Sequence, residues 1–176
     1  MVQLRDRELD DAALLQVAIR GVRTCAPLSV PFIVNDRVDI AMLAGADGVH
    51  LGQCDLKPAQ ARCIVGPDAI VGLSTHSADQ IAAAESEAVD YIGVGPIHAT
   101  PTKPGRPAVG AALVRYAAAH SSRPFFAIGG IEPSNVSEVV DAGGRAVSVL
   151  RFVSRASDPR AAARDILDAL SSGRGH

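Results

Sequence analysis

Hydrophobic residues along the chain occur in two kinds of segment that alternate. Short β-branched runs recur at intervals of about 20 to 30 residues, and Ala-rich stretches with helical spacing separate them. The runs predict strands over Val2–Arg5, Phe32–Val34, Gly48–Leu51, Ile70–Leu73, Tyr91–Val94, Phe125–Ile128 and Ala146–Leu150. The intervening stretches predict helices over Asp10–Arg20, Val38–Ala44, Pro58–Ile64, Ser77–Glu87, Ala111–His120, Pro133–Ala142 and Pro159–Ser171.

The predicted strands are apolar throughout, which indicates a parallel sheet covered by helices, an α/β fold. Nearly every strand is followed at once by polar or Gly-rich residues, as the active-end loops of a (βα)8 TIM barrel are, although an open doubly wound sheet is an alternative. We expect residues 1–176 to form a single domain. Seven βα units are visible where a barrel has eight, so the first strand and helix are predicted to be missing, which would leave strand edges unpaired.

Composition limits the classes of partner. The chain has 176 residues, 48% of them hydrophobic, a formal net charge of -2 and only 3% aromatic residues, which disfavours nucleic-acid binding and favours a small-molecule partner. No run approaches the roughly 18 apolar residues of a membrane helix, and no hydrophobic signal core follows Met1. Three irregularly spaced cysteines fit reduced thiols, and we expect a cytoplasmic protein.

Polar residues at the ends of the early strands are candidates for binding an anion and a metal ion. Gln3, Arg5 and Arg7 alternate along the first strand and would point to one side as a fork for an anion, although a solvated basic terminus is an alternative. Asp36 and Asp55 follow neighbouring strands and suit Mg²⁺ bridging to substrate phosphates. The alternative is that each aspartate caps a helix.

Polar groups at the later strand ends are candidates for holding phosphate. The loop from Gly95 to Gly105 carries hydroxyls, an ammonium and rigidifying prolines, and is either a functional anion-binding loop or a Pro-rich surface turn. Gly129-Gly130 and Leu150-Arg151 follow the strands after which barrels commonly bind phosphate, though Gly-Gly is as often only a tight turn. Ser74 ends another strand and is interpreted as a hydrogen-bonding group. His50, His76 and His98 are scattered without metal-ligand spacing.

Taken together, these motifs resemble the thiamine-phosphate synthase family over nearly the whole chain. The resemblance rests on Gln3-x-Arg5-x-Arg7, Asn35-Asp36, Gly52-Gln53-x-Asp55, Gly72-x-Ser74-x-His76, Gly95-Pro96-Ile97 with Thr100-x-Thr102-Lys103, and Gly129-Gly130-Ile131. It implies a βα barrel with Mg²⁺ as cofactor. It also implies a transferase that joins a pyrimidine diphosphate to a thiazole phosphate, with or without a carboxylate on the thiazole, and releases pyrophosphate.

The resemblance also implies roles for individual residues. The pyrimidine diphosphate would contact Gln3, Leu4, Arg5, Asp6, Arg7, Asn35, Ser74 and Lys103, with Arg5, Ser74 and Lys103 catalytic. Mg²⁺ would be held by Asp36 and Asp55. The thiazole phosphate would be surrounded by Thr100, Pro101, Thr102, Gly130, Leu150 and Arg151.

The chain departs from the family pattern at three points. Arg7 stands where Lys is usual, Arg151 stands where Ser is frequent, and the strand and helix that precede the Gln-x-Arg segment in the family are not seen here. Two alternatives are a thiazole tautomerase-like enzyme, which has less need of the arginine fork and the aspartates, and a non-catalytic paralogue that binds thiazole phosphate. We expect no nucleic-acid or membrane partner, and a homo-oligomer stays open.

Overall fold

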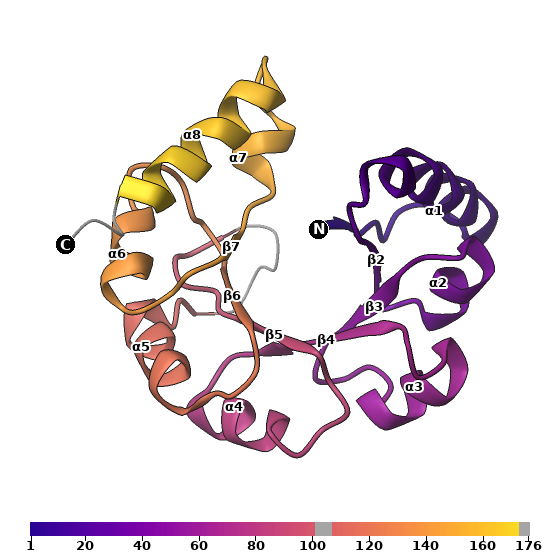
Figure 1. Ribbon diagram of the computed structural model, residues 1–176, viewed down its shortest axis with the longest axis horizontal. Coiled ribbons are helices and arrows are strands. Elements are labelled where there is room, and N and C mark those ends of the chain that lie inside the picture. Colours follow the sequence, from indigo (N-terminus) through magenta and orange to yellow (C-terminus); the bar gives the residue numbers. More distant parts are fainter. Residues whose placement is uncertain (101–106, 173–176) are drawn as a thin grey trace. The chain divides into compact units, whose positions relative to one another are not determined.

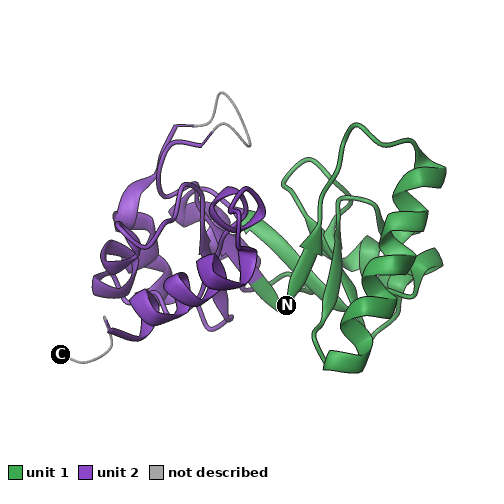
Figure 2. Ribbon diagram, turned by 90° about the horizontal axis from the view of Figure 1, so that it is seen from above, with its two compact units in different colours: residues 1–74, 86–91 green, residues 75–85, 92–176 purple. Residues whose placement is uncertain are grey.

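Strands and helices alternate along most of the chain (Figure 1). The computed structural model describes residues 1–100 and 107–172. The chain divides into two compact units, unit 1 with residues 1–74 and 86–91 and unit 2 with residues 75–85 and 92–176 (Figure 2). Each unit is built from consecutive βα repeats, the arrangement that a parallel sheet requires.

Unit 1 contains the first strands and the helices that follow them. Its elements are β1 (Val2–Leu4), α1 (Asp11–Cys25), the 3-10 helix η1 (Ala26–Leu28), β2 (Phe32–Asn35), α2 (Val38–Ala44), β3 (Gly48–Leu51), α3 (Pro58–Val65) and β4 (Ile70–Thr75), whose last residue belongs to unit 2. The strands β1 to β4 are parallel and adjacent in chain order. In Figure 1 the helices α1, α2 and α3 lie along one face of these strands. Ile33, Val49 and Val71 are fully buried. This burial of aliphatic side chains stabilises the unit.

Unit 2 continues the same repeat. Its elements are α4 (Ala78–Ala84), β5 (Tyr91–Val94), whose first residue belongs to unit 1, α5 (Gly110–His120), β6 (Phe125–Ile128), α6 (Val136–Asp141), β7 (Val147–Ser148), α7 (Arg151–Ser154) and α8 (Pro159–Ser172). The strands β5, β6 and β7 are parallel and adjacent. Val94, Val114 and Val139 are fully buried and form part of its aliphatic core.

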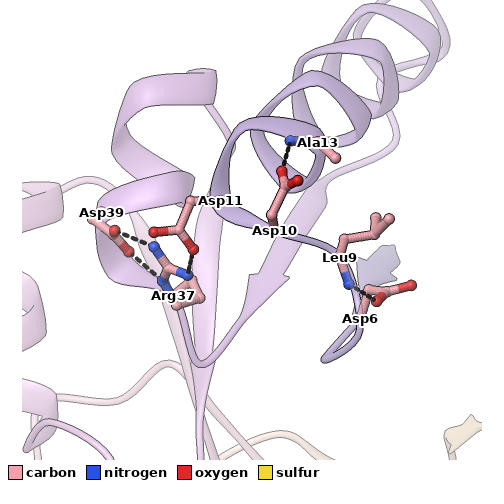
Figure 3. Close-up of polar contacts among 7 residues, drawn as sticks. All are labelled: Asp6, Leu9, Asp10, Asp11, Ala13, Arg37 and Asp39. Carbon is pink, nitrogen blue, oxygen red and sulfur yellow. Dashed lines mark hydrogen bonds and ion pairs between the residues drawn. The ribbon is translucent and has the colours of Figure 1, made fainter.

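Local polar contacts fix the conformation of the loop between β1 and α1 (Figure 3). The Asp10 carboxylate accepts a hydrogen bond from the Ala13 N–H at 2.8 Å and caps the helix. The Asp6 carboxylate accepts from the backbone N–H groups of Glu8 and Leu9, at 2.8 and 2.9 Å. These two aspartates fold the segment that carries Arg5 and Arg7.

The predicted pattern of elements is largely confirmed. The bounds are as predicted for β3, β5, β6 and α2, and the strand pairs described within each unit are parallel. The helix α6 begins at Val136 and not at Pro133 as predicted, because Asn135 bonds the Glu132 N–H and the Gly130 carbonyl and the chain turns there. The helix α7 was not expected. None of the helices in the described ranges is long and apolar enough to span a membrane.

Candidate active site

Apart from Lys103, which lies outside the described residues, the polar residues predicted for the diphosphate and the metal ion lie in unit 1, at the carboxyl ends of its strands. Arg5 and Arg7 follow β1, Asp36 follows β2, and Asp55 lies in the loop after β3. Ser74 lies at the end of β4. Because the strands are parallel, these ends share one edge of the sheet, where α/β proteins bind their ligands.

Asp36 has an unusual backbone conformation. Its φ angle of 64° lies in the left-handed region, which an aspartate tolerates better than most residues. Its N–H donates to the His50 carbonyl at 2.9 Å, and its carboxylate accepts from an Arg7 Nη atom at 3.0 Å. Asp36 does not cap α2, whose N-cap residue is Arg37. The backbone turn therefore directs this carboxylate to an arginine of the predicted anion fork.

Asp55 lies beside Asp36. Its Oδ2 accepts a hydrogen bond from the Gly52 N–H at 2.7 Å, and the N-cap residue of α3 is Lys57, so Asp55 is not a helix cap either. Partial burial raises the pKa of Asp55, and the neighbouring Asp36 carboxyl raises it further. Two adjacent carboxylates repel each other when both are ionised, and a bound cation relieves that repulsion.

This pair of carboxylates fits a hard cation such as Mg²⁺. Mg²⁺ is typically held by one or two carboxylates and completes its shell with water and substrate phosphate oxygens. Among the described residues no cluster of three or more His, Cys, Asp or Glu side chains suits a metal ion, so a complete protein cage is not formed there. The donor set therefore suits an ion that shares its ligands with a substrate.

The remaining residues of the first strand differ in their surroundings. The Nε of Arg5 is buried and has no hydrogen-bond partner within residues 1–100 and 107–172, and a buried donor of this kind is costly unless a ligand satisfies it. The Arg7 side chain is 65% exposed. The Asp6 carboxylate binds backbone N–H groups of its own loop, which lower its pKa, so it shapes the loop. Leu4 is half-buried and Asn35 is buried at the end of β2.

Sequence reasoning missed a cluster of hydrogen bonds around His50. One ring nitrogen, Nε2, lies 2.8 Å from Ser74 Oγ, and the other, Nδ1, lies 2.9 Å from Tyr91 Oη. All three residues are buried and belong to unit 1. The signal in the sequence was a polar residue inside an otherwise apolar strand, Gly48–Leu51, together with Gly72 at the facing position of β4.

The residues predicted for the thiazole phosphate lie in unit 2. An Arg151 Nη atom contacts Thr100 Oγ1 at 3.4 Å, and a Cβ added to Gly130 would lie 3.1 Å from the Ala99 carbonyl oxygen. Gly130 has a φ angle of 62°, a conformation that favours glycine, and its backbone lies against His98 and Ala99. Leu150 is exposed beside Arg151. Pro101, Thr102 and Lys103 lie outside the described residues.

A family comparison decides the assignment. The model of the thiamine monophosphate synthase family matches residues 1–153. The chain belongs to this family. It is also 48% identical to the thiamine-phosphate synthase of Acidothermus cellulolyticus, an alignment that covers 98% of this chain and 82% of the relative. A thiamine-phosphate synthase of Thermosynechococcus vestitus is 49% identical, again over 98% of this chain.

The relatives of this family differ in length. The chain covers 49% of the Thermosynechococcus vestitus relative, so it spans about half the length of the longer relatives that it matches. Among solved structures, the thiamine phosphate pyrophosphorylase of Pyrococcus furiosus superposes with a TM-score of 0.88 at 28% identity, covering 98% of this chain and 83% of the other. A 3-hexulose-6-phosphate synthase, at 20% identity and a TM-score of 0.71, shares the fold. The predicted α/β fold of the TIM-barrel type is thereby confirmed.

Proposed function

We propose that the chain is a transferase that makes thiamine phosphate. It would join a 4-amino-2-methylpyrimidine, supplied as the 5-hydroxymethyl diphosphate, to a thiazole ethyl phosphate. The carbon–oxygen bond between the pyrimidine methylene and the diphosphate breaks, and the thiazole nitrogen forms a new bond to that methylene carbon. Pyrophosphate leaves with the electron pair of the broken bond, so the reaction needs no oxidant.

One observation carries this proposal. In unit 1 the buried, unpartnered Arg5 Nε lies on the same strand edge as the adjacent carboxylates of Asp36 and Asp55. The Arg5 donor suits an anion, and the two carboxylates suit a cation. A diphosphate that carries a divalent metal ion provides both. A thiazole tautomerase-like activity explains the aspartate pair less well, because it releases no diphosphate.

The residues of unit 1 have separable roles in this proposal. Asp36 and Asp55 would hold Mg²⁺, which supplies positive charge that stabilises the departing diphosphate. Arg5 donates hydrogen bonds to the diphosphate oxygens, and Ser74 donates one more. Gln3 and Asn35 bind the pyrimidine diphosphate. Charge on the leaving group is thus stabilised by groups already held in place, which lowers the barrier without a protein nucleophile.

Arg7 has two states in this scheme. In the structure it pairs with the Asp36 carboxylate at 3.0 Å, an exposed contact of small stabilising effect. A cation on Asp36 would compete with Arg7, and the released guanidinium would then be available to the diphosphate. Arginine at this position offers a fork of donors rather than the point charge of a lysine.

The thiazole phosphate is assigned to unit 2. Thr100 and Arg151 present a hydroxyl and a guanidinium 3.4 Å apart, and Gly130 presents backbone beside the same loop. Pro101, Thr102 and Leu150 complete the proposed contacts, and Lys103 is assigned to the departing pyrophosphate. Arg151, where the family frequently has Ser, adds a positive charge suited to a phosphate.

Product analysis tests the proposal. The purified chain is incubated with both substrates and Mg²⁺, and thiamine phosphate is measured by chromatography against time. We expect turnover in the wild-type chain and a loss of about 100-fold in kcat for Arg5→Gln, the size of effect typical for removing one donor to a developing charge. The control is Arg160→Gln, an exposed arginine of α8, which should leave turnover unchanged.

Two other results would contradict the proposal. Binding of thiazole phosphate without any release of pyrophosphate would favour the non-catalytic paralogue. Isomerisation of a thiazole phosphate with no requirement for the pyrimidine substrate would favour the tautomerase-like activity.

A further inference from the structure

His50 bridges two hydroxyl groups inside unit 1. Its Nε2 lies 2.8 Å from Ser74 Oγ and its Nδ1 lies 2.9 Å from Tyr91 Oη. The three residues expose 6 to 7% of their surface. In its neutral form a histidine donates through one ring nitrogen and accepts through the other. The direction of one hydrogen bond therefore fixes the direction of the other.

The backbone makes room for the tyrosine ring. His50 faces Gly72 in the register of β3 and β4, and a Cβ added to Gly72 would lie 2.2 Å from Tyr91 Cζ. Any side chain at position 72 would displace the ring, since real Cβ atoms do not approach other atoms so closely. Glycine at this position thus allows the phenol to reach His50, with the two ring centroids 5.4 Å apart.

The acidity of the Tyr91 phenol sets the direction of its hydrogen bond with His50. Burial raises the pKa of the Tyr91 phenol, so the group keeps its proton at neutral pH. A side-chain hydrogen bond with Gln3 partly lowers this pKa. A phenol is a stronger hydrogen-bond donor and a weaker acceptor than a serine hydroxyl, so of the two hydroxyl groups that flank His50 the phenol donates to Nδ1 and the serine oxygen accepts from Nε2.

We propose that Tyr91 is a positioning residue that holds His50 in the tautomer with hydrogen on Nε2. His50 then donates to Ser74 Oγ, and the Ser74 hydroxyl hydrogen is left to point at a bound anion. The Ser74 backbone is itself fixed, because its carbonyl accepts from the Gln53 side chain at 2.6 Å. Only the naming of that anion as the substrate diphosphate rests on the proposed function.

Removing the phenol oxygen should abolish the preference of His50 for the Nε2–H tautomer. In Tyr91→Phe the ring remains, but His50 Nδ1 loses the phenol donor that selects the Nε2–H tautomer. A tautomer with hydrogen on Nδ1 would accept from Ser74 through Nε2. The Ser74 hydrogen would then point at His50 and away from the anion.

Nitrogen NMR of the histidine rings tests the relay without any substrate. Long-range correlations between ring nitrogens and carbon-bound protons distinguish the two neutral tautomers, and His50→Gln identifies the His50 signals among the five histidines. We expect the Nε2–H tautomer alone in the wild-type chain and a mixture in Tyr91→Phe. The matched control is Tyr116→Phe, the other tyrosine of the chain, which stacks on His120 in α5. It should leave the His50 signals unchanged.

Kinetics provide the second readout. If Ser74 contributes a correctly directed hydrogen bond to the leaving group, Tyr91→Phe should lower kcat about tenfold with little change in the KM for thiazole phosphate. Tyr116→Phe should match the wild-type chain. Thermal unfolding of each variant checks that the fold is retained.

The outcomes separate this proposal from the proposed function. An Nδ1–H tautomer in the wild-type chain, or an unchanged His50 spectrum in Tyr91→Phe, would overturn the relay whatever the activity. A wild-type chain with the Nε2–H tautomer but no transferase activity would overturn the proposed function and leave the relay supported. A spectrum that changes in Tyr91→Phe with kcat unaltered would contradict the role assigned to the Ser74 hydrogen.

Discussion

The carboxylates of Asp36 and Asp55 are neighbours, and Arg7 donates a hydrogen bond to Asp36. If they hold Mg²⁺ for a diphosphate, replacing either by asparagine should reduce Mg²⁺-dependent affinity for the pyrimidine diphosphate by at least about tenfold, because an amide lacks the charge that a divalent ion requires. Calorimetric titration with and without a chelator measures this. Asp165→Asn, an exposed aspartate of α8, is the control. Equal affinity with Mg²⁺ and with chelator in the wild-type chain would remove the metal assignment.

Asp55→Asn should weaken Mg²⁺-dependent binding but should not lower the stability of the fold. The pKa of Asp55 is raised in the folded chain by burial and by Asp36, so the folded state holds this proton more tightly than the unfolded state. Stability from this residue therefore falls as pH rises from the ordinary aspartate pKa through the raised one. At neutral pH without Mg²⁺, Asp55→Asn should unfold at the same or a higher temperature than the wild-type chain. A clear drop in melting temperature would show that the Asp55 charge stabilises the fold.

Thr100 and Lys103 test the division of roles within one loop. Thr100 contacts Arg151, so Thr100→Val should raise the KM for thiazole phosphate about tenfold with kcat less affected. Lys103→Ala should lower kcat about 100-fold with a smaller effect on that KM, because its ammonium is assigned to the departing charge. Steady-state kinetics separate the two. Equal effects on KM in both variants would show that the loop acts as one clamp.

Single residues also show how far the sequence predicts the candidate site. Arg7, Asp36, Asp55 and Ser74 were singled out because a polar residue directly after an apolar strand lies at the ligand-binding edge of a parallel sheet. Tyr91 was missed because it begins a buried strand and reads as core. Its role depends on the register that brings it beside Gly72 and His50, and register is a long-range property that local pattern does not contain.

Between elements, Arg37 connects the start of α1 with the start of α2 (Figure 3). Its guanidinium contacts Asp11 at 2.5 Å and Asp39 at 2.6 Å, and its hydrogen bonds lower the pKa of both carboxyls. Since the folded pKa values are depressed, this stabilisation is complete above the ordinary aspartate pKa, near 4, and is lost as pH falls below it. Urea unfolding should show that Arg37→Gln is less stable than the wild-type chain at pH 6, and that the difference shrinks at pH 3.

The control for this cluster is Arg20→Gln, an exposed arginine on α1. It should show no such pH-dependent difference. A constant difference between wild-type and Arg37→Gln at both pH values would mean that Arg37 acts through packing and not through its ion pairs.

The bounds of helices and strands were predicted well where a residue at the end of the element determines them. The helix α2 ends at Ala44, as predicted, because Gly45 after it adopts the left-handed conformation that terminates helices. The last strand was overpredicted: Ala146–Leu150 is apolar enough for a strand, but only Val147–Ser148 is one, because Leu150 already begins the turn into α7. The four residues of α7 carry no periodicity long enough to be detected.

For the whole molecule, family and fold rest on observations of different kinds. The fold follows from parallel βα repeats and from superposition on a solved relative at a TM-score of 0.88. The activity is inferred from residues that this chain itself carries, since it spans 49% of a relative such as that of Thermosynechococcus vestitus and 82% of that of Acidothermus cellulolyticus. The decisive test therefore uses the 176-residue chain itself.

Phosphorus NMR of one reaction mixture tests the central claim most directly. The chain, the pyrimidine diphosphate and the thiazole phosphate are observed together, first with chelator and then after addition of Mg²⁺. We predict no change with chelator. After Mg²⁺ is added, pyrophosphate should appear in equal amount to thiamine phosphate, at a rate reduced in Asp36→Asn. Pyrophosphate formed with chelator present, or Mg²⁺-dependent loss of the diphosphate without thiamine phosphate, would contradict the assignment of these strand ends as a diphosphate-transfer site.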